Sequence, residues 1–512
     1  GMIFHAKKDL KSFYVLLALF LFTSFALKIF LNERPFEPRE RDYALVGSFY
    51  VFAMWIAFGV YAIYEGLKKY LSPKITIPAV LAVSMLAAPV LLAKENWDDH
   101  DRSGKYTALA MAKAYLDSCG PNAILFTIGD NDTFPLWYAQ EIEGYRTDVR
   151  IVNTSLLATD WYIDQMKNKA YKSDPLPISF TREQYRGSNR DGVLFVEKTK
   201  EPLVLDEVLK FIKLEDERAT VEMNSGKKLH YYPSNKIILP VDKDVIIKNN
   251  VVAKKFQDSI VSEITFTIKG QALYKNRLMM LDILNENNWK RPMYFTGGSF
   301  ADEDFLWLKD YLELDGMCYK IVPIKTPKVK GGSPLDMGII DSDRMYDIVM
   351  KWDWGNSGNP NMLHDIETRR NSVSYRSNIA RLMEVLINED KNDKAEKLID
   401  LAMQKMPIEQ FGYYTLVEPF VQGYYQIGKK DKAEKILKTL IVKYQESLTY
   451  YNSLTINQQN RMAMDVISEI ERYRGLLEIA EVAKDTSFYN AEKVKFNNYN
   501  KMFSRFDRDM LK

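Results

Sequence analysis

The stretch Ala123–Tyr138 reads AILFTIGDNDTFPLWY and decides the fold that we predict for the chain. Ile124–Phe126 is an apolar run typical of a buried strand. Small and acidic residues, Gly129–Asp132, follow as a turn, and the threonine and proline just after them favour the start of a helix. The apolar segment Val149–Asn153 comes after that helix and predicts a second strand. The stretch therefore predicts a βαβ unit, in which ligand-binding groups lie at the carboxyl ends of the strands.

The acidic turn is the first candidate ligand site. Asp130, Asn131 and Asp132 offer short polar side chains that ligate a cation or orient a sugar hydroxyl. Trp137 and Trp161 offer aromatic faces against which a sugar ring can stack. The alternative is that one aspartate caps the helix while the other binds amides of the turn. Both interpretations stand on the sequence alone.

Three apolar segments precede this unit, although the mean hydropathy of −0.28 and the net charge of +2 are those of an ordinary soluble protein. The segments are Phe13–Leu31, Tyr43–Leu67 and Ile75–Ala93. Each is long enough to cross about 30 Å of hydrocarbon, for which roughly 20 helical residues are needed. The first is too long for a cleavable signal peptide and lacks a cleavage site. We predict three membrane spans and, from the small net charge, no nucleic-acid partner.

Lysines set the predicted orientation of these spans. Basic residues precede the first span and lie between the second and third, and positive charge favours the cytoplasmic side. The loop between the first two spans, and all residues after about 95, are then outside. The lysines in question are Lys7, Lys8, Lys11, Lys68, Lys69 and Lys74.

The outer loop Glu33–Asp42 is rich in both charges and lies near the lipid head groups. Arg39 and Arg41 are candidates to bind a lipid phosphate, and Glu40 or Asp42 is the candidate catalytic carboxylate. The alternative is a solvated hairpin whose charges pair with one another. Charged short loops are common and perturbed carboxylates are rare, which favours the hairpin.

A second acidic patch follows the third span. Asp98, Asp99, His100 and Asp101 include two ligand types for a divalent metal. Four adjacent residues do not all point one way, and capping of the next helix explains the patch more simply. The chain contains no cofactor-binding motif, and the sequence does not decide whether it binds a divalent cation.

The remainder of the chain divides into three parts by composition: an α/β region at 96–330, a linker at 331–370 and a helical region at 371–512. Within the α/β region the apolar pattern predicts helices over 205–213, 277–287 and 302–313. It predicts strands over 192–197, 236–240, 245–247, 260–268, 289–296 and 318–324. Cys119 and Cys318 are the only cysteines, and single buried thiols are favoured over a disulfide.

The helical region contains a short repeat. Asp393–Lys397 reads DKAEK, and the same five letters recur at Asp431–Lys435. The spacing is close to the roughly 34 residues of a tetratricopeptide (TPR) repeat, so we predict TPR-like stacked helical hairpins. A peptide groove and a packing platform for the α/β region are both consistent with the pattern, and so few repeats favour the platform.

Four stretches together resemble a known bacterial family of large multi-span membrane proteins, described mainly as a domain of unknown function. They are Glu40–Tyr50, Lys94–Ser103, Gly129–Tyr138 and Asn288–Pro292. That family is similar to the transmembrane protein O-mannosyltransferases of the GT-C superfamily, which join a membrane core to an outer repeat-bearing domain. Full members carry more spans and hold their catalytic acid in an earlier outer loop. The resemblance implies that this chain corresponds to their carboxyl-terminal part.

The resemblance implies a fold and two functional hypotheses. The fold is a membrane-anchored α/β protein in the bacterial inner membrane, with residues after about 95 in the periplasm. In the first hypothesis the chain is part of a GT-C glycosyltransferase and contributes acceptor binding. It then uses a polyprenyl-phosphate sugar, a protein or glycan acceptor, and a multi-span membrane partner. In the second hypothesis it is a non-enzymatic binding or scaffold module.

Overall fold

The computed structural model describes residues 1–33, 41–223, 226–299, 301–326 and 336–506, without the side chains of Asp98 and Asp99. The chain divides into two compact units, Gly1–Ser103 and Gly104–Lys512. We describe each unit by itself.

The N-terminal unit is built from helices alone among its described residues. Helix α4 packs against α1, α2 and α5, and Trp55 of α4 is buried against Phe20 with ring centroids 5.5 Å apart. Two π-helical turns, η1 and η3, continue α2 and α5 without a break. The elements are α1 (Met2–Lys8), α2 (Leu10–Leu21), η1 (Phe22–Ala26), α3 (Leu27–Leu31), η2 (Asp42–Leu45), α4 (Val46–Leu67), α5 (Pro73–Met85), η3 (Leu86–Val90) and α6 (Leu91–His100).

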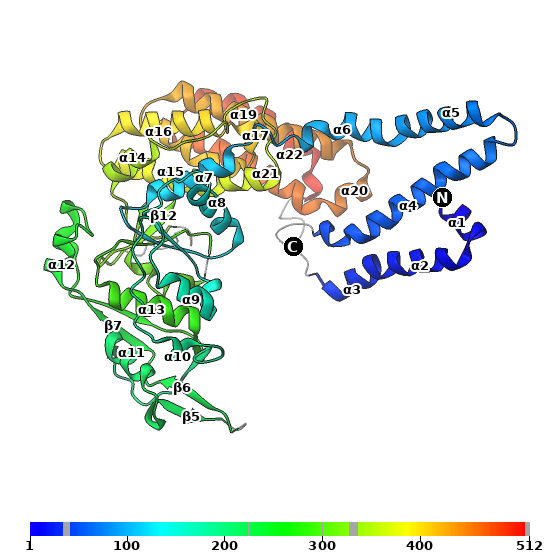
Figure 1. The fold of residues 1–512 in the computed structure, drawn as a ribbon. Coiled ribbons are helices and arrows are strands. Elements are labelled where there is room, and N and C mark those ends of the chain that lie inside the picture. The colour runs from blue at the N-terminus through cyan, green and yellow to red at the C-terminus, as the bar shows by residue number, and fades with distance from the viewer. Residues whose placement is uncertain (34–40, 224–225, 300, 327–335, 507–512) are drawn as a thin grey trace. The chain divides into compact units, whose positions relative to one another are not determined.

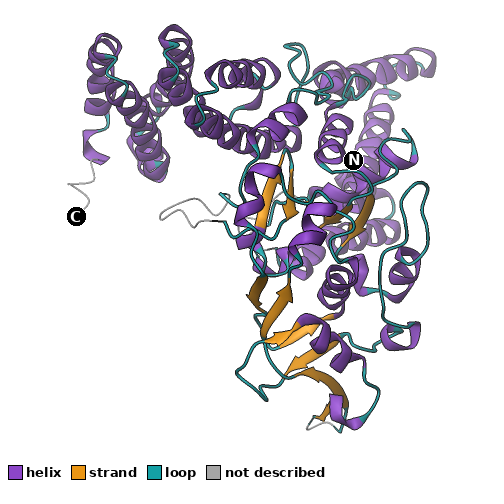
Figure 2. Cartoon of the chain, turned by 90° about the vertical axis from the view of Figure 1, so that its left-hand side faces the viewer, coloured by secondary structure: helices purple, strands orange, loops and turns teal. Residues whose placement is uncertain are grey.

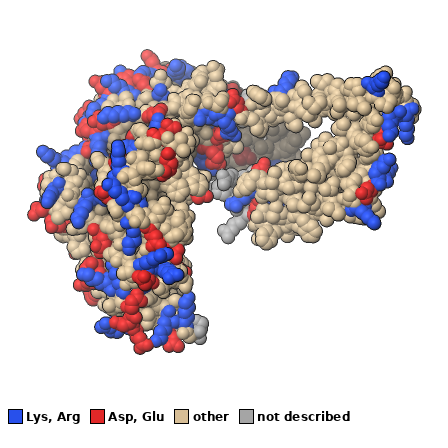
Figure 3. All heavy atoms as spheres, in the orientation of Figure 1, with Lys and Arg blue, Asp and Glu red and all other residues tan. Residues whose placement is uncertain are grey.

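Three continuous helices of this unit are long and apolar enough to cross a membrane. They are Leu10–Leu31, Asp42–Leu67 and Pro73–Trp97, and each contains one of the three predicted spans in full. Their large apolar side chains are mostly exposed, as expected for helices that face lipid. Figure 3 shows these helices largely free of charged atoms, with charges gathered near their ends. Length and composition are therefore compatible with membrane anchoring.

The second unit is organised around a five-stranded sheet with the strand order β11-β12-β10-β1-β2. Strands β10, β1 and β2 are parallel, while β12 and β11 continue the sheet antiparallel. Helix α8 (Asp130–Glu141) connects β1 to β2, so the predicted βαβ unit is confirmed. The strands are β1 (Ile124–Thr127), β2 (Arg150–Asn153), β10 (Met293–Phe295), β11 (Leu312–Asp315) and β12 (Cys318–Ile321).

The chain between β2 and β10 holds two smaller sheets, ordered β5-β6-β3-β9 and β4-β7-β8 (Figure 2). Helix α11 packs on both sheets and on α13. The elements are α9 (Asp160–Met166), α10 (Arg182–Tyr185), β3 (Gly192–Phe195), β4 (Leu203–Val204), α11 (Leu205–Lys213), β5 (Thr220–Glu222), β6 (Lys228–Tyr232), β7 (Lys236–Pro240), α12 (Lys243–Lys248), β8 (Glu263–Thr267), β9 (Ala272–Tyr274) and α13 (Lys275–Asn287).

The C-terminal part of this unit is helical and forms three successive hairpins, α15/α16, α18/α19 and α21/α22, which pack on one another (Figure 1). The two DKAEK copies begin at equivalent places, one residue inside α16 and α19. Asn378 of α15 donates to the Gly316 carbonyl at 2.9 Å and so joins this part to the sheet. The helices are α15 (Ile366–Asn388), α16 (Asn392–Lys405), α17 (Ile408–Phe411), α18 (Glu418–Gln426), α19 (Lys430–Ser453), α20 (Ile456–Arg461), α21 (Ala463–Val482) and α22 (Thr486–Met502).

Three local expectations are wrong. Residues 245–247 lie in helix α12, not in a strand, because the Asp242 carboxylate caps that helix and accepts from Asp244 N at 2.9 Å. The predicted helix over 302–313 is replaced by two short 3₁₀ helices, since Leu306 and Trp307 adopt φ of 52° and 60°. Helix α8 begins at Asp130, so three of the four residues expected to form a turn before it, Asp130–Asp132, lie in its first turn, and Gly129 is its N-cap.

The segment expected to be a linker, 331–370, is ordered where the structure describes it. It holds α14 (Ser342–Val349), which packs against β11, α15 and α7 (Thr107–Ser118). The amphipathic pattern of α14 explains this packing, because Met345 and Val349 lie four residues apart on one helical face and are fully buried.

Candidate functional site

The candidate site lies at the carboxyl edge of the central sheet, where β1, β2 and β10 end. Strand β1 pairs with β2 on one side and with β10 on the other, all three in parallel. The chain leaves β1 through α8 toward β2, and the neighbour on the other side comes from much later in the sequence. Open parallel sheets bind ligands outside the carboxyl ends at such a point.

Asp132 joins the ends of two strands at this edge. Its carboxylate accepts from the backbone N–H groups of Ile128 and Gly129, at 2.8 and 2.9 Å. The Thr296 hydroxyl, just beyond β10, donates to the same carboxylate at 2.7 Å. Asp132 is the third residue of α8, where an acidic side chain also interacts favourably with the helix dipole. These hydrogen bonds and the position in the first turn of α8 support the capping interpretation for Asp132.

Asn153 fixes the end of β2 in a similar way. Its Oδ1 accepts from the backbone N–H groups of Ser155 and Leu156, both at 2.9 Å, and its Nδ2 donates to the Thr133 hydroxyl at 3.0 Å. Ser155 in turn donates to the Ile128 carbonyl at 3.1 Å. The loops after β1 and β2 are therefore held together by hydrogen bonds, of which the one between Asn153 and Thr133 is buried and the one between Ser155 and Ile128 is exposed.

Asp130 and Asn131 differ from Asp132. Both side chains are exposed in the first turn of α8, and neither makes a hydrogen bond or ion pair with another described residue. They are the polar groups of the motif that stay available to a ligand.

The two predicted aromatic residues lie in different environments. Trp137 is half-buried and packs against the core and Phe134, with ring centroids 5.6 Å apart. Trp161, in α9, keeps 53% of its surface exposed. Of the two tryptophans, Trp161 therefore has the more accessible ring face for stacking against a ligand.

A surface cleft of about 460 Å³ lies beside the loop after β2. Asn276, in its wall, donates to the Thr154 carbonyl at 3.1 Å and ties the cleft to the sheet edge. Its charges are paired: Lys275 contacts Asp191 at 2.6 Å, and Arg277 forms an ion pair with Asp304. The lining residues are Ala158, Asp191, Tyr274, Lys275, Asn276, Arg277 and Glu303.

Sequence reasoning did not include Thr296, Asn276 or Arg277 in the site. The sequence contained one clue, the pair Gly297-Gly298 shortly after the apolar strand, and in the structure both glycines adopt positive φ, 76° and 81°. A Cβ at Gly297 would lie 2.9 Å from the Tyr319 ring, so a side chain there is excluded. Such a glycine pair marks a strand end at which a tight loop turns over the sheet.

The candidates of the N-terminal unit are only partly described. Arg39 and Glu40 lie outside the described residues. Asp42 begins η2, is exposed, and accepts from Tyr43 N at 3.0 Å. Arg41 is exposed as well.

The acidic patch contains His100, whose Nδ1 contacts the Asn96 carbonyl at 2.8 Å, and Asp101, whose carboxylate accepts from Ser103 N at 2.9 Å. The side chains of Asp98 and Asp99 are not described. Among the residues that were searched, no three His, Cys, Asp or Glu side chains are grouped to hold a metal ion.

A buried charged cluster supports the antiparallel half of the sheet. Glu313 and Lys320 pair at 3.2 Å, and Arg344 contacts Asp315 at 3.0 Å. Burial raises the pKa of Glu313 to about 7, against the opposing effect of Lys320. Nearby, Cys119 and Cys318 are free and buried, with their Sγ atoms 4.0 Å apart.

Comparison with known families gives one match. Residues 108–344 match the family described as TMEM260-associated domain 2. The match covers just under half of the chain and contains every described strand, including the carboxyl edge of the central sheet. No curated protein and no solved structure matches the chain.

Proposed function

We propose that this chain is the membrane-anchored, acceptor-binding part of a GT-C glycosyltransferase that uses a lipid-linked phosphosugar. The observation that carries the proposal is the TMEM260-associated domain 2 match, which covers the α/β region with its candidate site. The three apolar helices directly before that region support attachment to a membrane. In this proposal the α/β region lies on the periplasmic side of a bacterial inner membrane.

The carboxyl edge suits recognition of a hydroxyl-bearing acceptor. The Asp130 carboxylate is able to accept hydrogen bonds from a ligand, the Asn131 amide is able to donate and accept them, and the exposed Trp161 ring offers an apolar face. Because Asp132 and Asn153 already hold the loops in place, a ligand there meets a preformed surface and loses little energy to ordering.

The catalytic groups belong elsewhere in the proposal. Inverting transfer to a hydroxyl needs a carboxylate base, and cations that stabilise the leaving phosphate. At the carboxyl edge, the lysine and arginine that line the cleft are already paired with aspartates. We therefore assign catalysis to a multi-span membrane partner. Within this chain, the candidates near lipid are Asp42 or Glu40 as the base and the adjacent arginines as the cations.

The test is a transfer assay with the full chain in nanodiscs, alone and together with candidate multi-span membrane proteins of the same organism. The donor is polyprenyl-phosphate mannose, and the acceptors are serine- and threonine-containing peptides. We expect transfer only when both proteins are present. Asp130→Asn should raise the KM for the acceptor with little change in kcat. Asp258→Asn, an exposed aspartate remote from the edge, is the matched control and should leave both constants unchanged.

Two results would contradict the proposal. Transfer by the chain alone that Asp42→Asn abolishes would place catalysis within this chain. Absence of transfer with every partner and donor, while acceptor peptides still bind at the carboxyl edge, would favour the non-enzymatic scaffold.

A further inference from the structure

A groove runs between two helices of the C-terminal part, α18 and α21, which are the first helices of the second and third hairpins. Its volume is about 640 Å³. One side carries Glu418, Gln422 and Gln426, spaced four residues apart on α18; the other carries Gly475, Ile479 and Val482 at similar spacing on α21. Each wall is therefore one continuous helix face.

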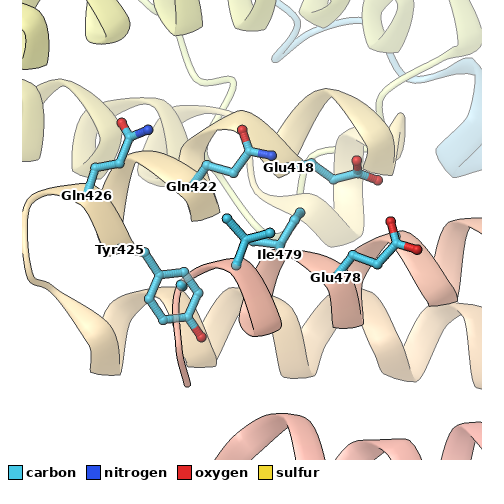
Figure 4. A pocket seen from close by; sticks show the side chains of 9 residues that line it. Glu418, Gln422, Tyr425, Gln426, Glu478 and Ile479 are labelled. Carbon is cyan, nitrogen blue, oxygen red and sulfur yellow. The ribbon is translucent and has the colours of Figure 1, made fainter. Parts of the chain in front are cut away.

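The two ends of the groove differ in chemistry. Figure 4 shows the carboxyl groups of Glu418 and Glu478 at one end, and Tyr425 with Gln426 at the other. Ile479, Val482 and Ala483 add an apolar surface along α21. Among the described residues that line the groove there is no lysine or arginine. The acidic end therefore favours a cation, and the rest favours an apolar side chain.

Glu418 is compensated by the protein only in part. It is half-buried, and it makes no hydrogen bond or ion pair with any residue that the structure describes. Burial raises its pKa to about 6, although Arg472 acts in the opposite direction. Arg472 itself pairs with Glu469 at 2.9 Å. A half-buried carboxylate without a partner is costly, and a bound cation would relieve that cost.

Gly475 keeps the groove open. It lies in the interior of α21, where glycine is unfavourable relative to alanine, and a Cβ at this position would meet no atom within 4 Å. Packing therefore gives no reason for a glycine here. Its effect in the structure is to leave bare backbone at the groove wall, where another chain can approach closely.

The remaining polar groups suit a peptide backbone. Gln422 and Gln426 are exposed and without a hydrogen-bond partner among the described residues, and each amide both donates and accepts, as a peptide group does. Glu418 to Gln426 spans about 12 Å of helix at 1.5 Å per residue, which about four residues of extended peptide match at 3.3 Å each.

We propose that the groove between α18 and α21 binds an extended peptide segment of a partner protein, with a lysine or arginine at Glu418 and Glu478 and an apolar side chain against Ile479 and Val482. The groove lies outside the region matched by the family, so this proposal is independent of the glycosyltransferase proposal.

The test uses the full chain in nanodiscs and fluorescein-labelled hexapeptides that carry a lysine two positions before a valine. We expect saturable binding, and at least a tenfold weaker affinity when glutamate replaces the lysine. The double variant Glu418→Gln with Glu478→Gln should weaken binding of the lysine peptide about tenfold, the effect of losing one charge-assisted hydrogen bond. Gly475→Leu should abolish binding by filling the groove.

Glu481→Gln is the matched control, because Glu481 is exposed on α21 but does not line the groove. Gly475→Ala checks that the helix tolerates a side chain, since its melting temperature should be no lower than that of the wild type and its binding weakened but measurable.

Other outcomes would overturn the proposal. Equal binding of the lysine and glutamate peptides, or binding of neither, would remove the charge argument. Displacement by spermidine as effectively as by the lysine peptide would show that the apolar half is unused. Concentration-dependent dimerisation that Gly475→Leu abolishes would identify the occupant as a second copy of this chain.

Discussion

The carboxyl edge of the central sheet and the groove between α18 and α21 use polar side chains in opposite ways. At the edge, Asp132 and Asn153 accept hydrogen bonds from several backbone N–H groups, and these bonds hold the loops. In the groove, Glu418 and Gln422 have no such bonds to described residues. A polar residue in a motif thus indicates a ligand site only after its internal partners have been counted.

The largest effect that separates the two regions is expected for Asp132→Ala. This change leaves two backbone N–H groups and the Thr296 hydroxyl without their acceptor, which costs about 3 kcal/mol of stability. Hydrogen exchange by mass spectrometry over residues 124–141 should show lost protection at Ile128 and Gly129. Unchanged protection would mean that the carboxylate is not required at the edge, and would weaken the contrast with the groove.

Glu418→Gln should stabilise the protein near neutral pH, whereas Asp132→Ala destabilises it. Because the folded-state pKa of Glu418 is raised from 4.5 to about 6, its contribution to stability is complete below pH 4.5 and is lost as the pH rises through 6. Glutamine avoids this loss. After a discount for partial solvent exposure, we expect a gain of about 1 kcal/mol at pH 7.5 and little difference at pH 4.5.

Thermal melts of the wild type and the variant at both pH values check this prediction. The charged and titratable groups around Glu418 are Arg472 and Glu478 on α21 and Tyr444 on α19. Glu478→Gln, at an exposed position, is the control and should show a smaller pH dependence. A destabilised Glu418→Gln variant would show that the carboxylate has a partner within the protein.

Gly475→Ala should stabilise α21 by about 0.7 kcal/mol, since the added Cβ meets open space and alanine favours helix over glycine. The melting temperature of the variant measures the gain. A loss of stability would mean that the glycine is required for packing, so the groove would be a by-product of helix contact.

The smallest effect on stability is expected for Asp130→Ala, below about 0.5 kcal/mol, because the side chain is exposed and makes no hydrogen bond to a described residue. Binding of glycan or peptide acceptors should nevertheless fall, as measured by titration calorimetry. Equal losses of stability and binding would make Asp130 a helix-capping residue like Asp132.

Local pattern predicted much of the fold. Strand β7 and helix α11 have the predicted ends, since clear apolar periodicity and a proline or charged boundary mark both. The strand predicted over 245–247 failed because Asp242 was not considered as a helix cap. Leu306 and Trp307 adopt left-handed φ, which nothing in their residue type predicts.

The candidate site was predicted only in part, for a physical reason. Asp130, Asn131 and Asp132 were found because they follow a strand directly, but their different roles depend on Thr296, which is 164 residues away in the sequence. The groove depends on a similar pairing of α18 with α21. Contacts of this kind arise from packing between distant segments, and local periodicity carries no information about them.

The pairing of β1 with β10 joins Ile124 to Met293 across the whole intervening sequence. Closing so long a loop has a large entropic cost, and proteins dominated by such contacts fold slowly. During synthesis, β1, α8 and β2 leave the ribosome well before their third parallel strand exists. All strands of the two smaller sheets are synthesised before β10, so the inserted segment is complete in sequence before the three parallel strands of the carboxyl edge can pair.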